Sequence, residues 1–493
     1  MVESDCKNRL RICNVYKCGA WRLCDIIPCA MKFAVMFGNR GFFPGELIAS
    51  ARRDFASVLK KHGHEALMMD ESLSRYGAVE TPDEGRSFAA FLAAHKSEVD
   101  GVIVALANFG DENGALYALR DAGVPILVQA YPDEIGKMDF SHRRDAVCGK
   151  IAMCNVLRQA GIRYTLTKNF AVDPKSADFA EDLRLFAATC RVVRGMRHLN
   201  VAAVGARTTA FKTVRFDEIA YQRKGVGIET IDLSYLFSLM EKADAKAVAG
   251  NVKALKRYAD FGKWPSEKVD ALARLAIALD KVKSDLSIDA FAIRCWDEFQ
   301  HRWGIAPCVV MAMLNSQGIP AACEMDVNNA VAMKALALAA DGPVGLFDVN
   351  NNYGKAKDRA IFFHCSALPA EMLKGKGRIG EHLMFRKAFG PGTGVGIFGG
   401  DVRPMPLTVA SMKTEDGLPC AFVTSGRITP DKIEKSFFGV GFVFRPDGGD
   451  ANAMLNYMAR NGYRHHVAFA EGDWSQAVGE AFGNYLGYEI EKI

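Results

Sequence analysis

The sequence predicts an α/β protein with two doubly wound parallel sheets, followed by an antiparallel, barrel-like β domain. Residues 31–145 alternate short apolar strands with amphipathic helices, and the same alternation resumes after residue 196. This pattern is typical of parallel sheets covered by helices. After Asp358 it gives way to β segments separated by Gly, Pro and Asp clusters. Because a chain of 493 residues exceeds the size of one core, we expect domains at 31–168, 169–355 and 356–493.

Residues 1–30 differ from the rest, and we expect them to be a disordered tail or a misassigned start. They lack an apolar segment long enough for a signal peptide. A cysteine-bound metal is disfavoured because no Cys-x-x-Cys pair occurs among their cysteines. At Met31 the sequence changes to Met-Lys-Phe-Ala-Val-Met-Phe-Gly, a typical opening strand. The segment holds five of the 13 cysteines: Cys6, Cys13, Cys18, Cys24 and Cys29.

The first domain is predicted to be one parallel sheet covered by helices. Its helices show apolar residues at helical spacing, and its strands are short apolar runs. Arg40 follows the first strand, at the edge where ligands of such sheets bind, although a solvated loop arginine is an equally good interpretation. The expected elements are strand Phe33–Gly38, helix Pro44–His62, strand Glu65–Met69, helix Asp83–His95, strand Gly101–Ala107, helix Asn113–Ala122, strand Pro125–Ala130, helix Gly149–Gly161 and strand Tyr164–Lys168.

The second domain repeats this pattern and ends in two strands that carry acids. Ile319–Asp326 and Pro343–Val349 read as short buried strands on either side of the helix Asn328–Ala340. Glu324 and Asp348 close these strands, so parallel pairing would put both carboxylates at the ligand-binding edge of the sheet. Two acids there suit a hard divalent cation or acid–base catalysis, while capping and loop hydrogen bonds are the plain alternative. The preceding elements are helix Ala177–Met196, strands Val201–Gly205 and Gly227–Leu233, helices Tyr235–Lys242, Asn251–Phe261 and Ser266–Lys283, strand Ala290–Trp296 and helix Ala306–Gln317.

The last domain is predicted to be antiparallel and supplies the candidate histidines. His465 and His466 begin its last strand, where adjacent side chains point to opposite faces, so only one of them can face a given site. A histidine on such a strand is by default a core residue, and His364 is the other credible ligand. Two carboxylates with one or two histidines and no cysteine set suit Mn²⁺ or Mg²⁺, and Co²⁺ is a further candidate. The expected elements are β segments Ile361–Cys365, Gly394–Phe398, Pro406–Lys413, Cys420–Ser425 and Phe438–Phe444, helix Ala451–Asn461, strand Tyr463–Ala470 and helix Ser475–Leu486.

Composition and charge exclude several classes of partner. The chain is 49% hydrophobic and 24% charged, with a net charge of +5 and no dense basic stripe. Neither nucleic acid nor a membrane is therefore an expected partner. The eight of 13 cysteines that follow residue 30 are scattered in apolar surroundings and read as reduced core residues. Reduced cysteines predict a cytoplasmic protein.

From Met31 onward the sequence resembles the L-fucose/L-arabinose isomerase family of metal-dependent ketol isomerases. The resemblance implies two Rossmann-like domains and a β-rich C-terminal domain. In L-fucose isomerases a Glu, an Asp and a C-terminal His bind Mn²⁺, which implies Glu324, Asp348 and one member of the histidine pair. In arabinose isomerases the second His of a similar pair is the ligand, which favours His466, with His465 and His364 as alternates.

The resemblance also implies an activity and an assembly. An open-chain aldose would become a ketose through a cis-enediolate, with Glu324 and Asp348 moving the proton. In fucose isomerases an Arg in the first βα loop contacts the sugar, which implies Arg40. Trp296 is our own further candidate for a sugar contact, with Trp474 as the second choice. In the family the first domain of one subunit closes the site of its neighbour, which implies a trimer or hexamer with the site at a subunit interface.

The sugar itself stays open, because the interval between the second acid and the histidine pair is shorter than in a typical L-fucose isomerase. L-fucose, L-arabinose and a modified hexose such as sulfoquinovose are all candidates. The competing hypotheses are a non-catalytic sugar-binding protein and a metal-dependent aldolase or epimerase.

Overall fold

The computed structural model describes residues 30–434, 437 and 439–492, which form two compact units, 30–194 and 195–492. Apart from Ala30, the predicted N-terminal tail lies outside the described residues. Among the described helices, none combines the length and the apolar character that a bilayer span requires.

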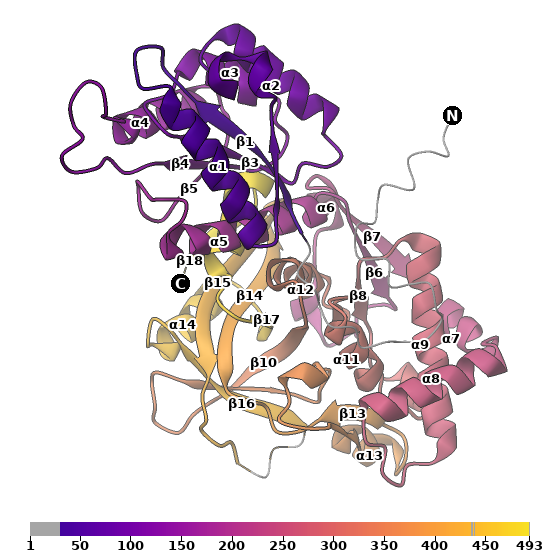
Figure 1. Cartoon of the computed structure of the whole chain (residues 1–493). Coiled ribbons are helices and arrows are strands. Elements are labelled where there is room, and N and C mark those ends of the chain that lie inside the picture. The colour runs from indigo at the N-terminus through magenta and orange to yellow at the C-terminus, as the bar shows by residue number, and fades with distance from the viewer. Residues whose placement is uncertain (1–29, 435–436, 438, 493) are drawn as a thin grey trace. The chain divides into compact units, whose positions relative to one another are not determined.

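The first unit is built on a parallel sheet in the order β2-β1-β3-β4-β5 (Figure 1). Alternate residues of β1 enter different cores, because Phe33 and Val35 pack with α1 and α5 while Ala34 and Met36 pack with α2, α3 and α4. Burial on both faces explains why the strand is a continuous apolar run. The elements are β1 (Lys32–Gly38), α1 (Glu46–Lys61), β2 (Glu65–Met68), α2 (Pro82–Ala94), β3 (Gly101–Leu106), α3 (Glu112–Leu119), β4 (Ile126–Ala130), α4 (Ala146–Gln159), β5 (Thr165–Leu166) and α5 (Ala177–Met196).

The first unit extends further along the chain than the predicted boundary between residues 168 and 169. Phe179, Leu183 and Phe186 of α5 share a core with β1, and the unit ends at Arg194. α5 covers one face of the first sheet, so its apolar side chains pack against the sheet that precedes it in the chain.

The second unit combines a parallel sheet, in the order β7-β6-β8-β9, with a closed antiparallel barrel. Both predicted Rossmann-like sheets and the barrel-like domain are thereby confirmed. The elements of the parallel part are β6 (Leu199–Val204), α6 (Glu218–Gln222), β7 (Val226–Ile231), α7 (Leu233–Glu241), α8 (Ala245–Tyr258), α9 (Ser266–Leu286), β8 (Ala290–Ile293), α10 (Glu298–Trp303), α11 (Cys308–Ser316), β9 (Ala321–Cys323) and α12 (Val327–Ala340).

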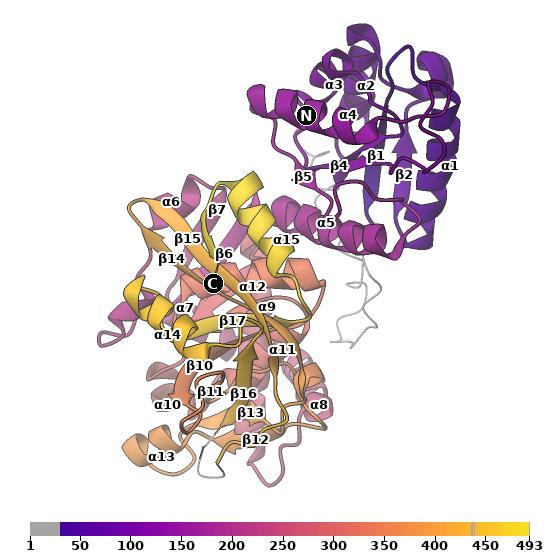
Figure 2. The same cartoon turned by 90° about the vertical axis from the view of Figure 1, so that its left-hand side faces the viewer.

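The barrel strands follow the order β14-β17-β10-β11-β16-β15, and β14 pairs again with β15 to close the ring. Figure 2 shows these strands beside α12, which packs against β8 and β9 as well as β14 and β17. A helix covered on all sides is expected to be apolar all round, and α12 is so except for the buried residues Asn328, Asn329 and Lys334. The elements are β10 (Val344–Asn352), β11 (Ala360–His364), β12 (Arg378–Glu381), α13 (Leu383–Phe389), β13 (Val395–Gly399), β14 (Met405–Glu415), β15 (Leu418–Ile428), β16 (Val440–Pro446), α14 (Ala451–Arg460), β17 (His466–Glu471), α15 (Ser475–Glu480) and β18 (Glu489–Lys492).

The predicted pairing of the two acid-bearing strands is wrong. β9 belongs to the parallel sheet, but β10 lies in the barrel, antiparallel to both β11 and β17. Asp348 is therefore a residue within a barrel strand and does not lie at the carboxyl edge of the parallel sheet. A fully buried strand has the same apolar sequence in either kind of sheet, so its composition could not reveal its partner.

Candidate functional site

The turn between β9 and α12 supplies the first candidate ligand. β9 ends at Cys323, and the next two residues, Glu324 and Met325, adopt left-handed conformations with φ of 60° and 61°. Asp326 then caps α12 by accepting a hydrogen bond from the backbone of Asn329. Within this turn Glu324 stays partly exposed, at 18%, while Asp326 is fully buried.

The barrel brings the other two predicted ligands together. Asp348 of β10 and His466 of β17 are direct partners across an antiparallel pair, so their side chains share one face. Nε2 of His466 lies 3.4 Å from Oδ1 of Asp348 and 3.3 Å from Oε2 of Glu324. The structure thus gathers Glu324, Asp348 and His466 around one point.

The donor atoms at this point fit a divalent cation. Nε2 of His466 and Oδ1 of Asp348 are buried without a hydrogen-bond partner. The other ring nitrogen, Nδ1, lies 2.9 Å from Oδ2 of Asp326, which leaves the Nε2 lone pair for a ligand. Metal-binding histidines usually donate their second N–H to a carboxylate in this way. Two carboxylate oxygens and an imidazole nitrogen suit Mn²⁺ or Mg²⁺.

The electrostatics of the three groups also favour a cation. Burial alone would lower the pKa of His466, but the hydrogen bond to Asp326 and the carboxylates of Glu324 and Asp348 raise it to about 10. Burial raises the pKa of Asp348, against the effect of the nearby histidines. The cluster therefore attracts a positive charge to Nε2, which can be a proton or a metal ion.

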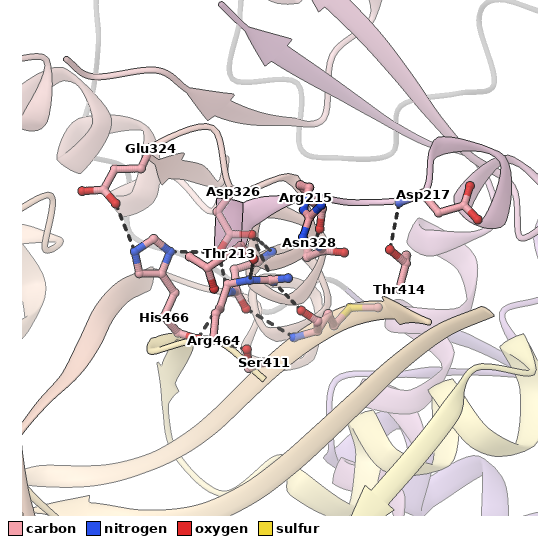
Figure 3. A network of polar contacts seen from close by, with 12 residues as sticks. Thr213, Arg215, Asp217, Glu324, Asp326, Asn328, Ser411, Thr414, Arg464 and His466 are labelled. Atoms are coloured by element: carbon pink, nitrogen blue, oxygen red, sulfur yellow. Dashed lines mark hydrogen bonds and ion pairs between the residues drawn. The ribbon is translucent and has the colours of Figure 1, made fainter. Parts of the chain in front are cut away.

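A buried ion pair behind His466 was missed by the sequence reasoning (Figure 3). Asp326 accepts from Arg464, whose Nη1 lies 3.2 Å from Oδ1, and both side chains are at least 95% buried. Arg464 also donates from Nε to the carbonyl oxygen of Thr213 at 3.0 Å. Burial would raise the pKa of Asp326, but Arg464 and His466 lower it to about 2. The only sequence signal was spacing, since Asp326 and Arg464 each lie two residues from a predicted ligand.

The two alternate histidines lie near the cluster. His465 is exposed, and one ring nitrogen lies within 4.8 Å of the ligand atoms of Asp348 and His466. His364 is buried and stacks on Phe347 with ring centroids 6.0 Å apart. Burial would lower the pKa of His364, but Cys365 and the acids Asp348 and Glu324 raise it to about 9.

The two predicted tryptophans occupy different places. Trp296 is half-buried and meets Phe211 edge-on, with ring centroids 6.2 Å apart. Phe211 lies 5.6 Å from the rings of both His465 and His466, so it links Trp296 to the cluster and is a second residue that the sequence reasoning missed. Trp474 follows the other end of β17, about 16 Å of strand away from His466, and its Nε1 donates to the carbonyl oxygen of Glu471.

Arg40 lies in the first unit, at the carboxyl end of β1. The chain runs from β1 to β2 on one side and to β3 on the other, so this edge is a topological switch point, where ligands of open α/β sheets bind. The Arg40 guanidinium is held 2.7 Å from Glu112 and 4.0 Å above the ring of Phe109. Arg40 is therefore a fixed cation at the expected edge.

Comparisons with known proteins agree with the resemblance seen in the sequence. Residues 34–197 match the family described as fucose/sulfoquinovose isomerase, N-terminal domain. The chain is 21% identical to sulfoquinovose isomerase from Priestia aryabhattai over 398 residues, 80% of this chain and 86% of that protein. It is 25% identical to sulfoquinovose isomerase from Clostridium sp. (strain MSTE9) over 343 residues, 67% of this chain and 72% of the relative.

Proposed function

Because the chain belongs to the fucose isomerase-like proteins, we propose that it is an aldose–ketose isomerase of an open-chain sugar. We propose sulfoquinovose as the first substrate to test, since relatives that align with most of this chain carry that name. L-fucose and L-arabinose are the next candidates.

The observation that carries the proposal is the convergence of Glu324, Asp348 and His466 around His466 Nε2, at 3.3 and 3.4 Å. These three residues would hold a divalent cation, for which Mn²⁺ is our first choice. When bound, such a cation acts as a Lewis acid on the carbonyl oxygen of the sugar. His466 is kept in the ligand tautomer by Asp326, so the protein holds the site ready for the ion.

The two carboxylates would carry out the proton transfers. Conversion of an aldose to a ketose removes a proton from C2 and returns one to C1, while a hydroxyl proton moves from O2 to O1. Glu324 is our candidate for the base at carbon. Asp348 is our candidate for the group that moves the hydroxyl proton between O2 and O1, because its carboxylate lies beside the same point as that of Glu324. Phe211 and Trp296 would shield the reacting carbons from water.

The test is ketose formation from a panel of aldoses with the intact chain. Metal-stripped protein would be reloaded with Mn²⁺, incubated with sulfoquinovose, L-fucose or L-arabinose in D₂O, and the products followed by NMR. An isomerase that works by proton transfer gives ketose with deuterium at C1, and Glu324→Gln forms it about 10³-fold more slowly. Tight sugar binding without ketose from any sugar would identify a binding protein, and three-carbon fragments or an epimer would identify an aldolase or epimerase.

A further inference from the structure

Four cysteine thiols meet beside the candidate metal ligands. They come from four separate places in the second unit: Cys295 follows β8, Cys308 begins α11, Cys323 ends β9 and Cys365 follows β11. Sγ of Cys295 lies 3.1 Å from Sγ of Cys323. Cys365 packs against the apolar cluster that contains Cys308, and its thiol is near enough to those of Cys308 and Cys323 to raise the pKa of both.

This cluster differs from ordinary packing of small apolar side chains. A free cysteine usually behaves as a small hydrophobic residue surrounded by carbon. Here the thiols of Cys295 and Cys323 are in direct contact, and the ligand atoms of Cys295, Cys323 and Glu324 all lie within 4.8 Å of one another. The Sγ–Sγ separation of 3.1 Å exceeds the roughly 2.05 Å of a disulfide bond, so both thiols are free to act as ligands.

We propose that Cys295, Cys323 and Glu324 form a second cation site, for a thiophilic divalent ion such as Zn²⁺ or Cd²⁺. The ligands of a tetrahedral zinc site, each about 2.0–2.3 Å from the ion, lie roughly 3.3–3.8 Å apart. Small side-chain rotations bring the three atoms to that spacing. Thiolate ligands select such ions over Mn²⁺ and Mg²⁺, which prefer oxygen and nitrogen donors. On binding, each coordinating thiol loses its proton to the solvent, and the ion takes the place of those protons.

An ion can reach the thiols from solvent, and its binding there would affect Glu324, which belongs to both candidate sites. Cys295, Cys308 and Cys323 are at most 5% exposed, whereas Cys365 is half-buried and offers an ion its entry. Glu324 also lies 3.3 Å from His466, and its carboxylate cannot serve both ions fully. An ion on the thiols would therefore draw Glu324 away from His466. The thiol site itself is independent of the proposed isomerase function; only its effect on turnover rests on that function.

The direct test is Cd²⁺ titration of the full chain, followed by the ultraviolet charge-transfer absorption of cadmium–thiolate bonds. The chain has 13 cysteines, so the informative quantity is the difference between variants. We expect the double variant Cys295→Ala/Cys323→Ala to lose one tightly bound equivalent of Cd²⁺ relative to wild type. The matched control Cys148→Ala removes an exposed thiol elsewhere and keeps that tight equivalent. Glu324→Gln keeps the thiolate absorption with affinity on the order of 10-fold weaker.

Two results would contradict the proposed thiol site. The first is a double variant, folded by circular dichroism, that keeps the full tight Cd²⁺ absorption. The second is a peptide map of freshly purified protein in which Cys295 and Cys323 are joined by a disulfide. For the effect on turnover, Cd²⁺ should inhibit the Mn²⁺-loaded wild type at least 10-fold more strongly than the double variant. If the protein converts no aldose, the absorption result still stands, so failure of the site and failure of the proposed function are distinguishable.

Discussion

Asp326→Asn tests whether the buried acid behind His466 positions the metal ligand. Asp326 accepts from His466 Nδ1 and pairs with Arg464, and it also caps α12. Asparagine caps a helix about as well as aspartate, so the substitution removes the charge and leaves the cap. His466 then loses the anion that fixes its tautomer, and Arg464 becomes a buried cation without its partner.

The two losses have different magnitudes and different readouts. An unpaired buried Arg464 lowers the free energy of unfolding by about 3–5 kcal/mol. Loss of the carboxylate behind His466 weakens Mn²⁺ binding on the order of 10–100-fold. Urea unfolding of metal-stripped protein measures the first quantity, and the EPR signal of free Mn²⁺ during titration measures the second.

Two further variants separate positioning from stability. Asp326→Asn/Arg464→Met removes both buried charges, so it should recover part of the unfolding free energy without recovering Mn²⁺ affinity. Asp217→Asn is the matched control, because Asp217 caps α6 by accepting from Ile219 and Ala220. It should change stability by no more than about 0.5 kcal/mol and leave Mn²⁺ binding intact. Folded Asp326→Asn that binds Mn²⁺ within twofold of wild type would refute the positioning role.

Three other outcomes follow from the same contacts. Glu324→Gln should lower kcat about 10³-fold, because it removes the base. The urea midpoint should not change, because Glu324 is partly exposed. A kcat near the wild-type value would contradict the assignment of Glu324 as the base. Metal-stripped protein should lose stability in acid, because the pKa of Asp326 is lowered to about 2: its contribution is present above pH 4 and disappears as the pH falls to 2. Stability should also fall in base, because the pKa of His466 is raised to about 10. The contribution of His466 to stability is present below pH 6.5 and disappears as the pH rises to 10. The urea midpoint measured from pH 2 to pH 10 tests both the acid and the alkaline loss. Trp296→Ala should raise the KM for sugar while Trp474→Ala does not, and steady-state kinetics that show equal effects would contradict the placement of these residues.

The sequence could predict the fold because local patterns determine most of it. The apolar run of β1 and the largely apolar helix α12 are visible without any tertiary knowledge, and both appear where expected. The pairing of β10 could not be predicted, because strands buried in a barrel and in a parallel sheet carry the same residues. The ion pair between Asp326 and Arg464 was not predicted from the sequence, for a related reason. Each is a single polar residue beside a predicted ligand, and only the fold shows that the two meet in the core.

The tripeptide Glu324-Met325-Asp326 explains why one short turn can organise the whole site. Two consecutive left-handed residues, neither of them glycine, cost about 1–2 kcal/mol each, and such strain persists where the surrounding structure imposes it. Their effect is to bring two carboxylates to the same imidazole, Glu324 at Nε2 and Asp326 at Nδ1. The turn thus makes one acid a ligand and the other its support. Replacing Met325, which is 8% exposed, by glycine should lower the free energy of unfolding in urea, because losing the buried side chain costs about 2–5 kcal/mol and relieving the strain regains only about 1–2 kcal/mol.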